Sequence, residues 1–209
     1  MSKSDRVRTK LSVVFNPMSL DTDKCIIARL HSLINEIVLS GVSILIINKW
    51  FENIKSFLSS NSCSSHSKNI FISHTLDFNL GFLTIDNKML NDTWWNLRKP
   101  YSLGYIHACN GARVINGTKL KKVYSQWVSY DDDLPASLGI DQVDECWKEI
   151  FKSFIKVTLS AENSTTLLAE MSDIYDGYIK ELAFSNHFFG KSVLISELGQ
   201  AFDSLEKNL

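Results

Sequence analysis

The sequence lacks an excess of charge of either sign, and it lacks a long apolar run. Its 22 basic and 23 acidic residues leave a formal net charge of -1, which gives no reason to expect a phosphate-binding surface or direct nucleic-acid binding. The longest mostly apolar run, residues 42–47, is far shorter than the ~20 residues that a membrane-spanning helix needs. The first ten residues also lack the apolar core of a signal peptide. We therefore expect a cytoplasmic protein without membrane association.

Two further absences limit the chemistry. The four cysteines (Cys25, Cys63, Cys109 and Cys146) include no C-x-x-C pair, which argues against a zinc knuckle or a thioredoxin-type motif. In a reducing compartment they should be free thiols. Residues 16–19 read Asn-Pro-Met-Ser, so the first predicted strand is not followed by a glycine-rich phosphate loop. We expect no cofactor and no metal.

The composition that remains is that of an ordinary globular protein. Hydrophobic residues make up 44% and charged residues 22% of the 209 positions, and a chain of this length can bury a sizeable core. We find no internal repeat and no linker. The sequence therefore predicts a single domain over residues 1–209, with a core over about 11–182 and a C-terminal extension, a strand and then a helix, over 183–209.

The first third of the chain alternates strands and helices. Short, β-branched apolar runs at 11–15, 42–47 and 69–73 are typical of buried strands. Apolar residues at helical spacing predict helices over about 21–40 and 50–58. This order predicts a parallel sheet with right-handed crossovers. The remaining predicted elements are a hairpin strand at 80–85, a helix at 87–97, strands at 102–108 and 123–129, a loop with a short helix at 110–122, amphipathic helices at 141–159 and 164–182, a strand at 192–196 and a helix at 197–209.

Two reactive side chains follow consecutive core strands. His74 comes directly after residues 69–73, and Cys109 comes directly after 102–108. Because functional groups collect at the carboxyl ends of parallel strands, we expect the two side chains to lie within reach of each other. A nearby imidazolium lowers the pKa of a thiol and can protonate a leaving amine. Gly111 would let a substrate approach the backbone closely.

The same residues carry a resemblance to a known family. Residues 106–111, Ile-His-Ala-Cys-Asn-Gly, resemble the nucleophile segment of caspases and of bacterial caspase-like, CHAT-type proteases. Residues 71–74 resemble the family's strand that ends in Ser-His or Gly-His, and looser similarity extends from about residue 13 to about 182. The resemblance implies an α/β fold: an open, mostly parallel, six-stranded sheet with helices on both faces. It also implies hydrolysis of peptide bonds by a dyad of His74 and Cys109.

One position departs from this pattern. The family has glycine after the catalytic histidine, and the N–H group of that glycine helps to bind the oxyanion. Here the residue is Thr75, which still offers an N–H group but has a branched Cβ that narrows the cleft. We expect an oxyanion hole formed by the N–H groups of Thr75 and Cys109.

Acidic residues near the predicted site are candidates for substrate binding. The run of Asp131, Asp132 and Asp133 is either a solvated turn or a source of a carboxylate that binds a basic substrate side chain. Asp86 is a second candidate for the same role. His107 lies close to Cys109 in sequence, and we interpret it as a packed or supporting histidine.

The sequence thus favours a caspase-like cysteine endopeptidase that acts on a protein or peptide substrate. A regulatory partner or ligand would control it, for example in bacterial antiviral defence. One alternative is a catalytically degenerate subunit of the same fold that serves as an interaction or regulatory module. Another is a different doubly wound α/β protein, such as a receiver-like or nucleotide-binding domain.

Overall fold

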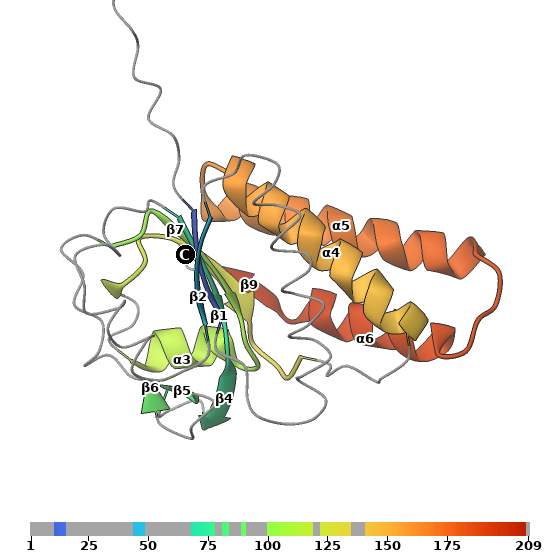
Figure 1. Cartoon of the computed structure of the whole chain (residues 1–209), viewed down its shortest axis with the longest axis horizontal. Coiled ribbons are helices and arrows are strands. Elements are labelled where there is room, and N and C mark those ends of the chain that lie inside the picture. The colour runs from blue at the N-terminus through green and yellow to red at the C-terminus, as the bar shows by residue number, and fades with distance from the viewer. Residues whose placement is uncertain are drawn as a thin grey trace, which may run out of the picture.

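The chain folds into a mixed α/β structure. The computed structural model describes residues 11–15, 44–48, 68–77, 81–83, 89–90, 100–118, 122–134 and 141–207. Within these residues a mostly parallel sheet has helices beside it (Figure 1). The predicted α/β class is confirmed, whereas the helices predicted over 21–40 and 50–58 lie outside the described residues.

The larger sheet has the strand order β2-β1-β3-β7-β8-β9. Its strands are β1 Leu11–Phe15, β2 Ile44–Asn48, β3 Lys68–Ile72, β7 Leu103–His107, β8 Trp127–Tyr130 and β9 Leu205–Lys207. All neighbouring strands are parallel except β8 and β9, which are antiparallel. The strands predicted at 11–15, 42–47, 69–73 and 102–108 are found close to their expected positions, whereas the one predicted at 123–129 begins only at Trp127.

A small second sheet follows β3 after a single residue. It contains β4 His74–Asp77, β5 Gly81–Leu83 and β6 Met89–Leu90, paired antiparallel in that order. The predicted hairpin-like excursion is therefore confirmed. The helix predicted over 87–97 is wrong at Met89–Leu90, because these two residues pair with β5 and this tertiary pairing overrides the local helical pattern.

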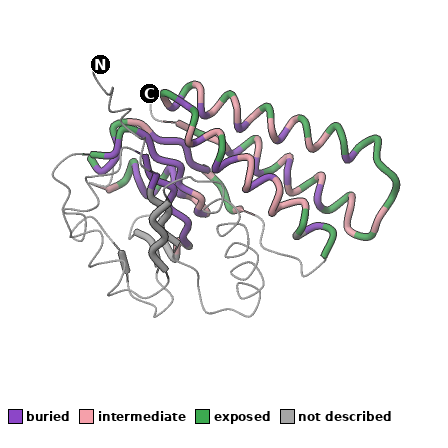
Figure 2. Tube along the Cα trace, turned by 45° about the horizontal axis from the view of Figure 1, so that its top comes forward, coloured by how far each residue is buried: buried purple, intermediate pink, exposed green. Residues whose placement is uncertain are grey.

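Helices lie on both sides of the larger sheet (Figure 1). On one side is α3, Gly111–Gly117, and on the other are α4 Asp141–Ser160, α5 Ser164–Phe184 and α6 Lys191–Asp203. Alternate strand residues face opposite sides, so Ile70 and Tyr105 join the core beneath α4, α5 and α6, while their neighbours Phe71 and Ile106 are buried without joining that cluster. Figure 2 shows the buried strands beside the half-exposed helices.

The C-terminal region differs from the prediction. The strand expected at 192–196 and the helix expected at 197–209 occur in the opposite order, as α6 and then β9. A short apolar run such as 193–195 does not by itself distinguish helix from strand. The buried residues Leu194, Leu198 and Ala201 recur at helical spacing and pack on the core, which decides for the helix.

Candidate active site

Cys109 stands at the carboxyl end of β7, where the chain turns sharply into α3. Asn110 adopts a left-handed conformation with φ 52, which asparagine tolerates better than most residues. The N–H group of Gly111 then donates to the carbonyl of Ala108 at 3.1 Å. A Cβ at Gly111 would lie only 2.3 Å from Oγ of Ser129, so glycine allows the close approach of α3 to β8.

The predicted residues of the neighbouring strand end reach this turn. Ser73 continues the pairing of β3 with β7, because its N–H group donates to the carbonyl of His107 at 3.1 Å. Thr75 then donates a hydrogen bond from Oγ1 to the carbonyl oxygen of Cys109 at 2.7 Å. His74, immediately before it, begins β4, and its side chain lies outside the described part. Thr75, which follows the end of β3, therefore contacts Cys109, which follows the end of β7.

The thiol of Cys109 is half-buried and contacts the backbone of Leu134. The N–H group of Leu134 points at the sulfur at 3.2 Å, and the sulfur lies 3.8 Å from the carbonyl oxygen of the same residue. Leu134 itself packs against the core cluster beneath the helices. The segment after β8 therefore covers one side of the sulfur.

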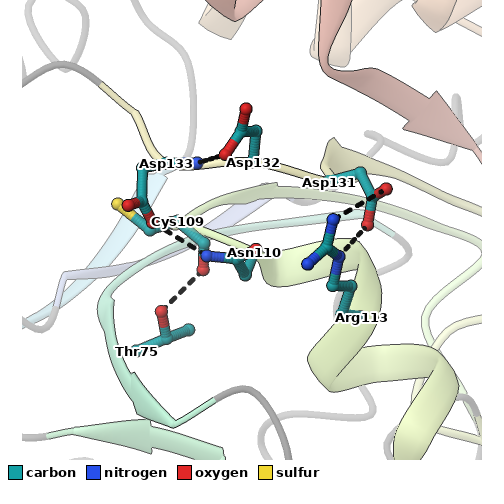
Figure 3. A network of polar contacts seen from close by, with 7 residues as sticks. All are labelled: Thr75, Cys109, Asn110, Arg113, Asp131, Asp132 and Asp133. Carbon is teal, nitrogen blue, oxygen red and sulfur yellow. Dashed lines mark hydrogen bonds and ion pairs between the residues drawn. The ribbon is translucent and has the colours of Figure 1, made fainter.

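The three predicted aspartates lie beside this turn, and each makes a different contact (Figure 3). The carbonyl of Asp132 accepts from the N–H group of Asn110 at 2.9 Å. The carboxylate of Asp133 accepts from the Asn110 side-chain amide at 2.8 Å. Asp131 forms an exposed ion pair with Arg113 at 2.7 Å. Figure 3 shows Asp133 on the same side as the sulfur and Asp131 at the far end of the network.

These surroundings keep the thiol protonated. Burial is the main cause that raises the pKa of Cys109, and the charges of Asp133 and Asp132 raise it further. The N–H groups of Leu134 and of Cys109 itself act in the opposite direction, because they stabilise a thiolate. The net pKa of the thiol lies above the ordinary value, and a raised pKa lowers the thiolate fraction at a given pH.

The N–H groups of the turn after β7 differ in their partners. Those of Asn110 and Gly111 already donate to Asp132 and Ala108. Within the described residues, the N–H group of Cys109 faces its own sulfur and no carbonyl. Thr75 contributes to the site through its hydroxyl group, a contact that the sequence analysis did not predict.

A polar cleft of about 670 Å³ opens on the other side of the aspartate run. Asp131 and Asp132 line it, whereas Asp133 and Cys109 do not. The predicted substrate-binding residues thus divide between two places, one beside the sulfur and one beside α6. Asp86 lies outside the described residues. Among the described residues, the others that line it are Arg113, Ser196, Gly199, Gln200, Asp203, Ser204 and Glu206.

His107 is packed among aromatic side chains, as the sequence analysis expected. Its ring meets those of Phe151 and Tyr130 edge-on, with centroids 5.2 and 5.7 Å apart. Its Nδ1 atom lies 2.7 Å from the hydroxyl of Tyr105. That hydroxyl contacts Tyr130 at 3.0 Å, and Tyr130 contacts Tyr175 at 2.9 Å. No sequence signal indicated this buried tyrosine chain, because its members come from three different elements.

No protein-family model matches the chain, and no curated protein matches it significantly. Among the described helices, none is both long enough and apolar enough to cross a lipid bilayer. Within the same residues, no group of three or more histidine, cysteine or acidic side chains is arranged to hold a metal ion.

Proposed function

We propose that the chain is a caspase-like cysteine endopeptidase in which Cys109 is the nucleophile and His74 is the general acid and base. The observation that carries the proposal is the 2.7 Å contact between the Thr75 hydroxyl and the carbonyl of Cys109. It links the residue next to His74 with the nucleophile itself, at one edge of a parallel sheet where functional groups collect. The mixed α/β fold, with a mostly parallel sheet and helices on both of its faces, supports the proposal, because the family that the sequence resembles has this class of fold.

The reaction would proceed by covalent catalysis. His74 takes the proton of the Cys109 thiol, and the thiolate attacks the carbonyl carbon of the scissile peptide bond. The N–H groups of Cys109 and Thr75 stabilise the oxyanion. The imidazolium then protonates the leaving amine, and the C–N bond breaks to give a thioester. Water, deprotonated by His74, hydrolyses the thioester and restores the free thiol.

The resting site is restrained, which fits an effector that a partner or ligand controls. Leu134 contacts the sulfur, and burial together with two carboxylates raises the pKa of the thiol. A regulator that moves the segment from Asp131 to Leu134 would uncover the sulfur and remove these charges from it. Asp133, Asp132 and, outside the described residues, Asp86 are the proposed sites for a basic substrate side chain. A cytoplasmic role in bacterial defence is consistent with this restraint.

Labelling with a peptide that carries a cysteine-directed electrophile tests the dyad. We expect the parent chain to be labelled at Cys109, Cys109→Ala not to be labelled there, and His74→Ala to react at least ~100-fold more slowly. Mass spectrometry of the digested protein identifies the modified residue.

Cys146→Ala is the matched control, because Cys146 is another half-buried thiol. Its burial and Glu181 raise the pKa of this thiol to about 11, and its removal should leave the labelling unchanged. Equal labelling of Cys109→Ala and the parent chain would show that the dyad assignment is wrong.

A second candidate is a catalytically degenerate subunit of the same fold. The raised pKa of Cys109 and the presence of Thr75 in place of glycine favour it. This candidate predicts a stable complex with a protein partner that survives Cys109→Ala. It also predicts that a broad peptide library is not cleaved at any pH at which the protein remains folded.

A further inference from the structure

The buried tyrosine chain ends at His107. The number of protons on its hydroxyl groups limits the protonation states that His107 can adopt. Its three contacts join Tyr175 to Tyr130, Tyr130 to Tyr105, and Tyr105 to Nδ1 of His107. Each hydroxyl supplies one proton, so three protons serve three hydrogen bonds when Nδ1 carries none. Every contact then holds one proton, and all donors point along the chain toward the imidazole.

A proton on Nδ1 would bring the total to four protons for three hydrogen bonds. The imidazole would donate to Tyr105, each hydroxyl would have to donate to the next, and the proton of Tyr175 would have no acceptor. All three tyrosines are 0% exposed, and among the described residues Tyr130 is the hydrogen-bond partner of the Tyr175 hydroxyl. The other neighbours of Tyr175 are the rings of Trp147, Phe154 and Phe202. A buried donor without an acceptor is costly, so this state is disfavoured.

The aromatic side chains that contact the imidazole carry no charge at neutral pH. Among the described residues of β7 and β8, these are the phenols of Tyr105 and Tyr130. From α4, the ring of Phe151 meets it edge-on. Among the described residues, the neighbours of Tyr175 at the far end of the chain are aromatic rings, which offer its proton no acceptor. The chain is therefore suited to fixing a tautomer and not to carrying protons.

We propose that the tyrosine chain holds His107 as a neutral imidazole with its proton on Nε2, so that His107 positions the end of β7 and is not the base for Cys109. His107 stands two residues before Cys109 and is the histidine nearest to it in the sequence. It is therefore the main alternative to His74 as the base. The assignment of the tautomer depends on the hydrogen-bond count alone. The exclusion of His107 as a base rests on the proposed peptidase function.

Nuclear magnetic resonance of the full chain, with ¹⁵N-labelled histidine, tests the tautomer. We expect a bare Nδ1 and a protonated Nε2 in His107, and we expect this state to persist at about pH 5.5, where an ordinary histidine is mostly protonated. Tyr124→Phe is the matched control, because it removes a buried hydroxyl that donates to Asn69 at 2.7 Å outside the chain. It should leave the His107 signals unchanged, whereas Tyr105→Phe should shift the Nδ1 signal. A proton on Nδ1 of the parent protein at pH 5.5 would overturn the assignment, whether or not either variant folds.

Labelling of Cys109 tests the second part. In His107→Asn the amide oxygen can still accept from Tyr105, but the side chain cannot take up a proton. We expect His107→Asn to keep the labelling rate within about threefold and to keep its pH profile, while His74→Asn loses it. Loss of labelling in folded His107→Asn would overturn the exclusion of His107 as the base. If labelling is insensitive to both Cys109 and His74, the peptidase proposal fails, and the tautomer is still decided by resonance.

Discussion

At the scale of single residues, Asp133 controls the charge beside the sulfur. Its carboxylate raises the pKa of Cys109 and accepts a hydrogen bond from Asn110. Asp133→Asn keeps an oxygen for that hydrogen bond and removes the charge. We expect the pKa of the thiol to fall, and alkylation of Cys109 by iodoacetamide near pH 8 to become about two- to fivefold faster.

Asp131→Asn is the matched control for this prediction. Asp131 pairs with Arg113 at the other end of the network and is not among the charges that raise the pKa of Cys109. Its alkylation rate should match that of the parent chain. Identical rates for Asp133→Asn and the parent would contradict the electrostatic account, and high salt should narrow any difference between them.

The sequence could place single residues at the site but could not supply their contacts. Cys109 and His74 were expected together because both follow the ends of neighbouring parallel strands, a rule that needs only the strand order, and Thr75 was expected beside them from the family resemblance. The contact of the sulfur with Leu134 involves a backbone group, which leaves no mark on side-chain identity. Whether Asp133 or Asp131 faces the sulfur depends on how the chain turns after β8, and three identical residues give no basis for a choice.

At the scale of secondary-structure elements, Lys68 joins the start of β3 to the end of α4. Its Nζ atom donates to the carbonyls of Leu159 and Ala161, both at 2.6 Å. The last carbonyls of a helix have no partner within the helix, and Lys68 is buried. Lys68→Met should therefore lower the free energy of unfolding by ~2 kcal/mol, because the carbonyls lose a charged donor. Urea denaturation followed by circular dichroism measures this change.

Lys180→Met is the comparison for that variant. Lys180 makes an equally short ion pair with Asp176, but both side chains are exposed, and such pairs contribute ~0–1 kcal/mol. Its unfolding midpoint should stay close to that of the parent chain. Equal losses in the two variants would show that Lys68 does not act as a helix cap.

Elements with a strong periodic pattern were predictable, and elements whose pairing decides their type were not. The helices α4 and α5 were expected because apolar residues recur along their full length, as Ile150, Phe154 and Leu167 illustrate. The two residues of β6 and the three of β9 are strands only because a partner strand lies beside them. Elements of two or three residues are too short to show a periodic sequence pattern.

At the scale of the whole molecule, three fully buried phenols make the fold sensitive to alkali. Burial is the main cause that raises the pKa values of Tyr105, Tyr130 and Tyr175 well above the ordinary 10.0. A folded-state pKa above the unfolded value means that the stabilisation is complete below about pH 10 and is lost as the pH rises beyond it. We expect these three tyrosines to ionise only when the protein unfolds.

An alkaline titration that records tyrosinate absorbance and circular dichroism together measures this coupling. The part of the absorbance change that belongs to the buried tyrosines should coincide with the loss of helical signal. Tyr105→Phe, if folded, should reduce that part by the contribution of one tyrosine. Ionisation of all the tyrosines before any loss of helix would show that the three hydroxyls are accessible to water.

The link between Asp131 and Ser204 sets the order in which the region around Cys109 can be completed. The N–H group of Asp131 donates to the carbonyl of Ser204 at 2.8 Å, next to the strand that pairs with β8. During translation, Cys109 leaves the ribosome long before residue 204 does. In a nascent chain the thiol is therefore present before the hydrogen bond between Asp131 and Ser204 can hold the neighbouring segment in place. During that interval chaperones can bind this region and small electrophiles can react with the thiol. Both become less favourable once α6 and β9 have docked.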